Sequence, residues 1–167
     1  MTASGIGYTA AVVVAAVFAV AAMAKLRDLR ATADGFERLG IPQVELFARM
    51  VPVTELAVAV LLLIVPAGGA ISALVTLAFF TTFLIGRLRA GVRAPCACFG
   101  ASAGAPLSGI EIARNLGLMV LASTALATDR PVRPTLLDLL VVLVPTAVGA
   151  GVLHLLRSRR EGTPATR

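Results

Sequence analysis

The chain has 167 residues, of which 58% are hydrophobic and only 14% are charged, and its mean hydropathy is +0.92. Soluble domains are usually about half apolar and about a quarter charged, so a soluble fold of this size could not hide so much apolar surface. The net charge of +6 does not indicate nucleic-acid binding, because the basic residues lie between and after apolar runs. These properties predict one integral membrane domain.

The first apolar run covers residues 6–24 and ends abruptly at Lys25-Leu26-Arg27-Asp28. A helix of this length, at about 1.5 Å per residue, can cross a hydrocarbon core of roughly 30 Å. The run closes with Ala22-Met23-Ala24, which resembles a signal-peptidase site, but its charges follow the run rather than precede it. We therefore expect a retained first transmembrane helix.

Residues 28–49 mix apolar and charged side chains, and Gly40 within them is typical of a helix end. This pattern predicts a short interfacial helix and a turn. A second transmembrane helix is expected to begin near Pro42, with its apolar part at 51–65 and Glu55 inside it.

The segment Pro66-Ala67-Gly68-Gly69 predicts a tight turn, and the third apolar run follows at 70–86. After a loop rich in Gly, Ala, Pro and Ser, a capping-box pattern from Ser108 to Glu111 predicts the start of the fourth span. A basic tail at 157–167 is expected to be disordered. The predicted fold is an all-α membrane bundle over residues 1–156, with spans at about 6–24, 51–65, 70–86, 109–127 and 135–156.

Lys and Arg are distributed unevenly among the segments between these spans. Five lie in 25–49, three in 87–107 and four in the tail, against two in 128–134. Because short cytoplasmic loops carry an excess of Lys and Arg, we predict an outside N-terminus and a cytoplasmic C-terminus in a bacterial-type inner or plasma membrane. In either orientation, one membrane face collects the unusual polar residues Lys25, Asp28, Glu55, Cys96, Cys98, Glu111, Arg114 and Asn115.

The only two cysteines, Cys96 and Cys98, are separated by one residue in the third loop. A disulfide between them would close a small, strained ring, and strained disulfides are readily reduced. The pair is therefore interpreted either as a redox-active dithiol or as two small apolar fillers. We expect no metal site, because two thiolates do not complete a zinc centre and the lone His154 is distant in sequence.

Glu55 lies within an apolar helix, where a carboxylate is costly and usually faces the bundle interior or a partner. Arg114, early in the fourth span, is predicted as that partner. The pair either tunes protons and charge beside the thiols, since a nearby Arg favours a thiolate, or is a structural ion pair. We expect Asn115 to form a hydrogen bond between helices.

Several motifs, in this order, resemble the methylamine utilisation protein MauE family, within the broader DoxX-like membrane proteins. The resemblance covers roughly residues 5–127, and its most specific part is a Cys-x-Cys-Phe-Gly motif followed by Arg-Asn. The motifs are Lys25-Leu-Arg-Asp28, Phe36 through Gly40-Ile-Pro42, Pro52-Val-Thr-Glu55, Cys96-Ala-Cys98-Phe99-Gly100 and Arg114-Asn115.

The resemblance implies a DoxX-like four-helix transmembrane bundle, here with a fifth C-terminal span, and a role in thiol–disulfide handling. It also implies maturation of an exported disulfide-containing enzyme such as methylamine dehydrogenase, with a thioredoxin-like partner, as a membrane oxidoreductase component. We expect four residues to carry the chemistry and five to support it: Cys96, Cys98, Glu55 and Arg114, supported by Lys25, Asp28, Phe99, Gly100 and Asn115.

Two other functions stay open. A non-catalytic DoxX-like subunit could anchor or assemble a partner enzyme without using its cysteines. A small transporter could line a pathway with the polar cluster, although the sequence lacks an evident inverted repeat. No cofactor beyond a redox-active disulfide is expected, and a quinone is an alternative that no residue of the sequence supports.

Overall fold

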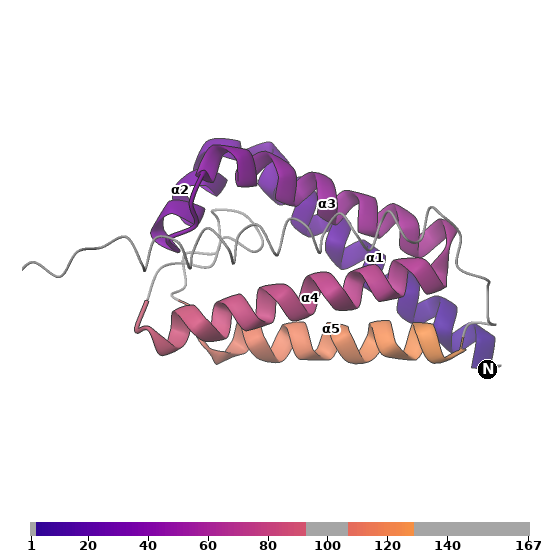
Figure 1. The fold of residues 1–167 in the computed structure, drawn as a ribbon. Helices are drawn as coiled ribbons and strands as arrows, with labels where there is room; N and C mark the ends of the chain where they lie inside the picture. The colour runs from indigo at the N-terminus through magenta and orange to yellow at the C-terminus, as the bar shows by residue number, and fades with distance from the viewer. Residues whose placement is uncertain (1–2, 93–106, 129–167) are drawn as a thin grey trace, which may run out of the picture.

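The computed structural model describes residues 3–92 and 107–128, and its regular structure there is helical (Figure 1). The helices are α1 (Ala3–Arg27), α2 (Leu29–Arg38), α3 (Val44–Ile64), α4 (Pro66–Arg89) and α5 (Gly109–Thr128). Four of them, all but the short α2, are long and apolar enough to cross a membrane. The predicted all-α bundle with four spans is confirmed, whereas the expected span at 135–156 and the tail at 157–167 lie outside the described residues.

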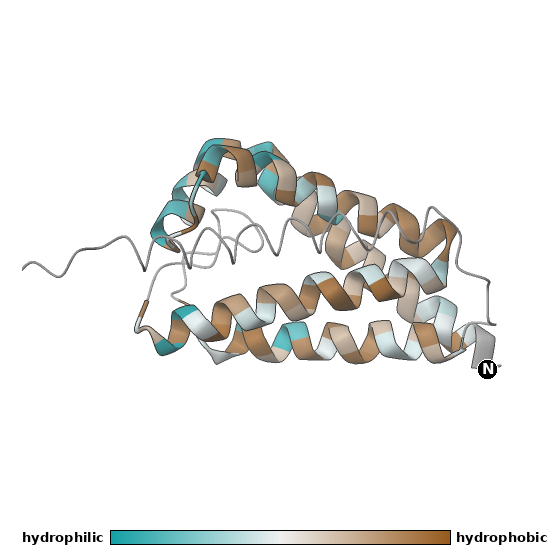
Figure 2. Ribbon diagram, viewed as in Figure 1, coloured by the Kyte–Doolittle hydropathy of each residue, from teal (hydrophilic) through white to brown (hydrophobic). Residues whose placement is uncertain are grey.

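The four long helices close a ring. α1 packs against α3 and α5, α4 packs against the same two helices, and α2 packs mainly against α3. Figure 1 shows that α2, the end of α1, the starts of α3 and α5 and the end of α4 gather at one end of the bundle. Hydropathy differs between the spans and this end of the bundle. The spans are mostly apolar, and hydrophilic residues concentrate around α2 (Figure 2).

A single residue, Asp28, separates α1 from α2. Its side chain accepts a hydrogen bond from the backbone N of Ala31 at 2.9 Å, which satisfies one of the free N–H groups at the start of α2. The buried Thr32 hydroxyl lies 3.2 Å from the backbone oxygen of Lys25 and 2.9 Å from that of Asp28. These contacts fix the bend that folds α2 over the end of the bundle.

Gly40 ends α2, as the sequence predicts, in a left-handed conformation with φ of 70°. Its N–H donates to the oxygen of Glu37 at 2.7 Å, and the N–H of Ile41 donates to the oxygen of Phe36 at 2.9 Å. This is the hydrogen-bond pattern of a Schellman motif, in which the left-handed residue favours glycine. α3 then begins at Val44, slightly later than the predicted start near Pro42.

The predicted turn at Pro66-Ala67-Gly68-Gly69 is wrong, because these residues form the first turn of α4. Only Val65 separates α3 from α4. Proline suits the first turn of a helix, because a backbone N–H at that position has no acceptor within the helix. A Cβ on Gly69 would lie 2.4 Å from the Cα of Leu62, so glycine permits the close return of α4 along α3.

The interior of the ring is built largely from small side chains. Small residues let the backbones of membrane helices approach closely and gain van der Waals contact. The main buried cluster comprises Ala10, Ala11, Val14, Ala15, Phe18, Val58, Ala59, Leu62, Ala70, Ala73, Leu77, Leu118, Ala122 and Ala125. All four spans contribute to this cluster, which forms the main apolar core of the bundle.

Candidate functional site

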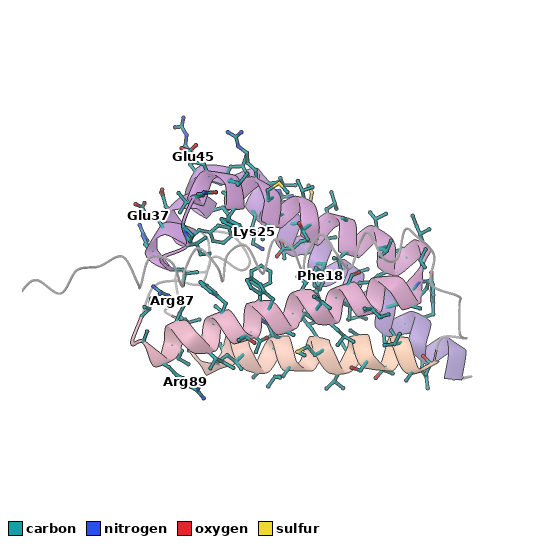
Figure 3. The ribbon with its side chains drawn as sticks, viewed as in Figure 1. Phe18, Lys25, Glu37, Glu45, Arg87 and Arg89 are labelled. Carbon is teal, nitrogen blue, oxygen red and sulfur yellow. The ribbon has the colours of Figure 1, made fainter. Side chains whose placement is uncertain are left out.

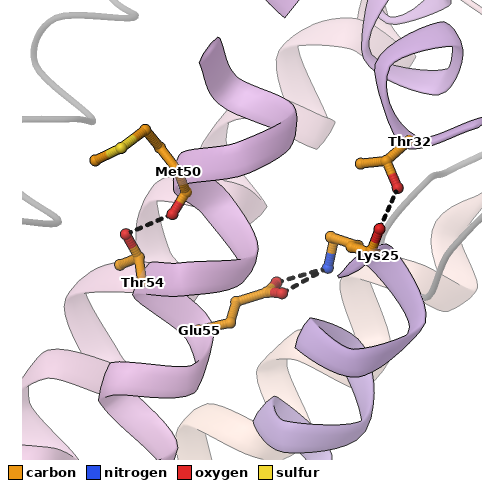
Figure 4. Close-up of polar contacts among 5 residues, drawn as sticks. All are labelled: Lys25, Thr32, Met50, Thr54 and Glu55. Atoms are coloured by element: carbon orange, nitrogen blue, oxygen red, sulfur yellow. Dashed lines mark hydrogen bonds and ion pairs between the residues drawn. The ribbon is translucent and has the colours of Figure 1, made fainter. Parts of the chain in front are cut away.

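Lys25 and Glu55 form an ion pair inside the polar end of the bundle (Figure 4). The Nζ of Lys25 lies 2.7 Å from Oε1 of Glu55 and 2.8 Å from Oε2. Lys25 is only 1% exposed and Glu55 only 7%. Isolated charges are costly at such depth, so each residue depends on the other for its place. Figure 3 shows Lys25 and Phe18 on the inner side of α1.

Helical phase explains why both side chains point inward. Residues three and four positions apart share one face of a helix, so a polar residue in phase with an apolar stripe is carried into the core. Lys25 continues the buried face of α1, and Glu55 lies within the buried face of α3. The buried face of α1 includes Val14, Phe18 and Ala21. The buried face of α3 includes Ala48, Val51, Val58 and Leu62. This phase is the sequence signal that could have identified Lys25 as the partner of Glu55.

The expected pairing of Glu55 with Arg114 is wrong. Lys25 contacts both carboxylate oxygens of Glu55, and α3 and α5, which carry Glu55 and Arg114, lie across the ring without direct contact. Arg114 is exposed on α5, and its electrostatic neighbours include Glu111 and Lys25. Arg114 therefore lies at the same end of the bundle as the ion pair, but it is not the counter-ion of Glu55.

Asn115 forms the predicted hydrogen bond between helices. Its Nδ2 donates to Oγ1 of Thr81 on α4 at 3.3 Å, and both side chains are buried. A buried amide without such a partner would lose the hydrogen bonds that it makes in water. Asn115 therefore helps to hold α5 against α4 near the ion pair.

A pocket of about 60 Å³ lies beside these groups, lined by residues of all five helices. Its polar members are Lys25, Glu55 and Asn115. The rest of the lining is apolar and includes four aromatic rings, those of Phe18, Phe36, Phe80 and Phe83. The pocket thus combines an apolar, aromatic wall with a few polar groups, which is the usual composition of a small-molecule site.

The two described residues that flank segment 93–106 meet at the margin of this pocket. Leu107 is buried with Leu39 and Leu84, and Val92 packs against the same cluster. Leu39 and Leu84 also line the pocket. The described residues on either side of the cysteine segment therefore lie together, next to the buried polar groups.

The start of α5 adopts the predicted capping box. The backbone N and the Oγ of Ser108 each lie 2.9 Å from Oε2 of Glu111, and the N–H of Ile110 donates to the Ser108 Oγ at 3.3 Å. These contacts satisfy free N–H groups at the helix start. They also fix the direction in which the chain enters α5 after segment 93–106.

Of the other predicted site residues, Asp28 lies at the start of α2, and the cysteine motif lies outside the described residues. Asp28 caps α2 and contributes to the bend rather than to the pocket lining. The motif from Cys96 through Cys98 to Phe99 and Gly100 lies outside the described residues. Across residues 3–92 and 107–128 no three His, Cys, Asp or Glu side chains come together in a way that could hold a metal ion.

Four apolar spans around a buried ion pair define a multi-pass, all-α membrane protein. The family model described as methylamine utilisation protein MauE matches residues 3–128, so the chain belongs to the MauE family. The match includes every described helix and the cysteine segment. Neither the curated proteins nor the solved structures contain a match to this chain.

Proposed function

We propose that this protein exchanges thiols and disulfides at the membrane through Cys96 and Cys98, during maturation of an exported disulfide-containing enzyme such as methylamine dehydrogenase. The description of its family, a methylamine utilisation protein, supports the pathway. The close spacing of the only two cysteines supports the chemistry, because a strained disulfide is easily reduced and re-formed.

The observation that carries the proposal is the convergence of Val92 and Leu107 on one cluster beside the pocket. These two residues flank the cysteine segment, and their cluster adjoins the pocket at the end of the bundle that holds Lys25 and Glu55. A redox pair at this end would work beside a buried polar site.

The exchange requires a partner with its own dithiol or disulfide, and a thioredoxin-like protein has that chemistry. The thiolate of one cysteine attacks the partner's disulfide, whose S–S bond breaks as a mixed disulfide forms. The second cysteine then attacks the mixed disulfide, leaving Cys96–Cys98 oxidised and the partner reduced by two electrons. The reverse sequence oxidises the partner. The exposed guanidinium of Arg114, seven residues after Leu107, would stabilise the attacking thiolate.

The Lys25–Glu55 pair has a supporting role in this proposal. Because Lys25 holds both carboxylate oxygens, Glu55 is placed to fix α1 against α3 rather than to accept protons on its own. The proposed orientation, with an outside N-terminus and a cytoplasmic C-terminus, follows from the distribution of Lys and Arg. It predicts a cytoplasmic side for the end of the bundle that holds Lys25 and Glu55, so the partner protein would have to relay the exchange across the membrane to the exported enzyme.

The experiment is a maturation assay with Cys96→Ser, Cys98→Ser and the double variant in the native membrane. We expect each variant to accumulate the exported enzyme with its cysteines reduced or mispaired, as measured by alkylation of that enzyme and mass spectrometry. Ser123→Ala, an exposed change of similar size on α5, is the control and should leave maturation intact. Normal disulfides in the exported enzyme with the double variant would refute the proposal.

A further inference from the structure

The guanidinium of Arg87 lies against the turn that ends α2. Arg87 is in the last turn of α4, and the turn contains Gly40 in its left-handed conformation. A Cβ on Gly40 would lie 2.6 Å from Nη2 of Arg87, 3.2 Å from Cζ and 3.5 Å from Nη1. Glycine therefore serves two purposes at this position, because it adopts the positive φ and leaves room for the guanidinium.

The side chain of Arg87 makes no hydrogen bond or ion pair with any residue in 3–92 or 107–128. Its Nε is buried and has no hydrogen-bond partner. Glu37 on α2 lies at the same end of the bundle (Figure 3), but its carboxylate forms no ion pair with Arg87. A buried polar group without a partner costs free energy and calls for an explanation such as a bound ion. The side chain as a whole is only half-buried, so an anion can approach it.

The depth of Arg87 in the membrane indicates where such an anion comes from. The span Pro66–Arg89 ends two residues after it, so the guanidinium lies where acyl chains give way to headgroups. An apolar cluster adjoins it, because Leu39 precedes Gly40, Leu84 lies one turn before Arg87, and both are buried in that cluster. A fixed cation next to apolar side chains matches the junction between the headgroup and the chains of a lipid.

The chemistry of a guanidinium favours a phosphate group. Its planar array of N–H donors can hold two oxygens of one phosphate at once, which an ammonium cannot do. A phospholipid with a net negative charge is favoured over phosphatidylcholine, because the choline of the latter cancels the charge of its own phosphate. In the proposed orientation Arg87 faces the cytoplasmic leaflet, where anionic lipids give the surface a negative potential.

We propose that Arg87, placed by Gly40 at the end of α4, binds the phosphate group of an anionic phospholipid. The Nη1 and Nη2 groups donate to the phosphate oxygens, and the acyl chains run along the exposed Leu88 and the lower part of α4. α2 packs against α1 and α3 but not against α4. A lipid bound at Arg87 would therefore join the end of α4 to the turn after α2.

Native mass spectrometry of the full-length protein in detergent tests this site. The protein is titrated with dioleoyl-phosphatidylglycerol and, separately, with dioleoyl-phosphatidylcholine, and we expect the anionic lipid to bind more tightly. Arg87→Gln should weaken binding of phosphatidylglycerol roughly 10-fold, the loss expected for a hydrogen bond to a charged group. Arg89→Gln is the matched control, because it removes the same charge from an exposed position of the same turn and should change the affinity less than 2-fold.

Arg87→Lys separates the loss of charge from the loss of the guanidinium. It keeps the positive charge without the planar donors, so it should bind phosphatidylglycerol with an affinity between those of the wild type and Arg87→Gln. Circular dichroism checks that each variant keeps its helical content before it is titrated. These comparisons therefore report on binding in folded protein.

Three results would overturn the lipid site. Equal affinities for the two lipids would show that the negative charge is not recognised. Equal losses in Arg87→Gln and Arg89→Gln would show a diffuse attraction to the basic end of the bundle instead of one bound phosphate. Displacement of phosphatidylglycerol by an equal concentration of inorganic phosphate would show that the site takes a free phosphate and not a lipid.

Discussion

The ammonium of Lys25, on the last turn of α1, is bound by both carboxylate oxygens of Glu55 on α3. The two residues are 30 positions apart, and the pair ties together the two helices that carry α2 between them. Because the pair is buried among apolar side chains, neither charge can be lost alone without leaving the other uncompensated. The pair therefore fixes the polar end of the bundle, where the pocket and both flanks of the cysteine segment lie.

Removing one member of this pair should destabilise the protein strongly. We expect Glu55→Gln and Lys25→Met each to lower the free energy of unfolding by about 3–5 kcal/mol, because each leaves one partner without its counter-charge. Thermal unfolding in detergent, followed by circular dichroism, measures the change. Glu45→Gln alters an exposed acid at the start of α3 and should have little effect.

The double variant Lys25→Met, Glu55→Leu should recover much of that loss, because it removes both charges and leaves apolar side chains. A double-mutant cycle gives the coupling between the two positions. Losses that simply add, with no recovery in the double variant, would show that the two residues act independently.

A larger side chain at Gly69 should force α3 and α4 apart. The added Cβ of Gly69→Ala would lie 2.4 Å from both the backbone N and the Cα of Leu62, and backbone cannot move aside as a flexible side chain can. We expect a clear drop in melting temperature. Gly117→Ala is the matched control, because nothing lies within 4 Å of its added Cβ and alanine favours a helix by up to about 1 kcal/mol. Equal melting temperatures for the two variants would contradict the close approach.

Ser108→Ala should weaken the start of α5. It removes the hydroxyl that contacts Glu111 and the N–H of Ile110, and loss of such a cap usually costs about 1 kcal/mol. Hydrogen exchange of the first turn of α5 in detergent should rise, while exchange in α3 stays the same. Ser123→Ala makes the same substitution at an exposed position of α5, and faster exchange there too would argue against a specific cap.

The sequence predicted the local features of the fold well. Apolar runs of sufficient length defined the spans, and the helix end at Gly40 and the capping box at Ser108 depend on residues only a few positions apart. The turn predicted at Pro66–Gly69 failed for a physical reason, since proline and glycine also serve a helix start and a close helix contact. Residue type alone does not distinguish a turn from a helix start or a close contact between helices.

The site could be predicted only in part, because its contacts join distant helices. The sequence placed Glu55 in the interior and Asn115 between helices, and both expectations are confirmed. It treated Lys25 as a charge flanking the membrane and assigned Glu55 to Arg114. The correct pairing depends on which helices are neighbours in the ring, and α3 adjoins α1 rather than α5. That order follows from packing of the whole bundle and not from any single segment.

The orientation of the protein can be measured at the same end of the bundle. Glu37→Cys, made in the Cys96→Ser, Cys98→Ser background, puts one thiol on an exposed position of α2. The excess of Lys and Arg around α2 predicts a cytoplasmic location. A membrane-impermeant maleimide should therefore label this thiol only after the membrane is opened. Labelling in intact cells would reverse the proposed orientation.

The most direct test of the thiol chemistry is differential alkylation of Cys96 and Cys98 in native membranes. One maleimide blocks free thiols, and a heavier one labels those released by reduction, so mass spectrometry gives the oxidised fraction. We expect both cysteines to shift together between dithiol and disulfide as oxidant or reductant is added, and Cys96→Ser to leave Cys98 unable to form the internal disulfide. Cysteines that stay fully reduced under every condition would contradict this expectation.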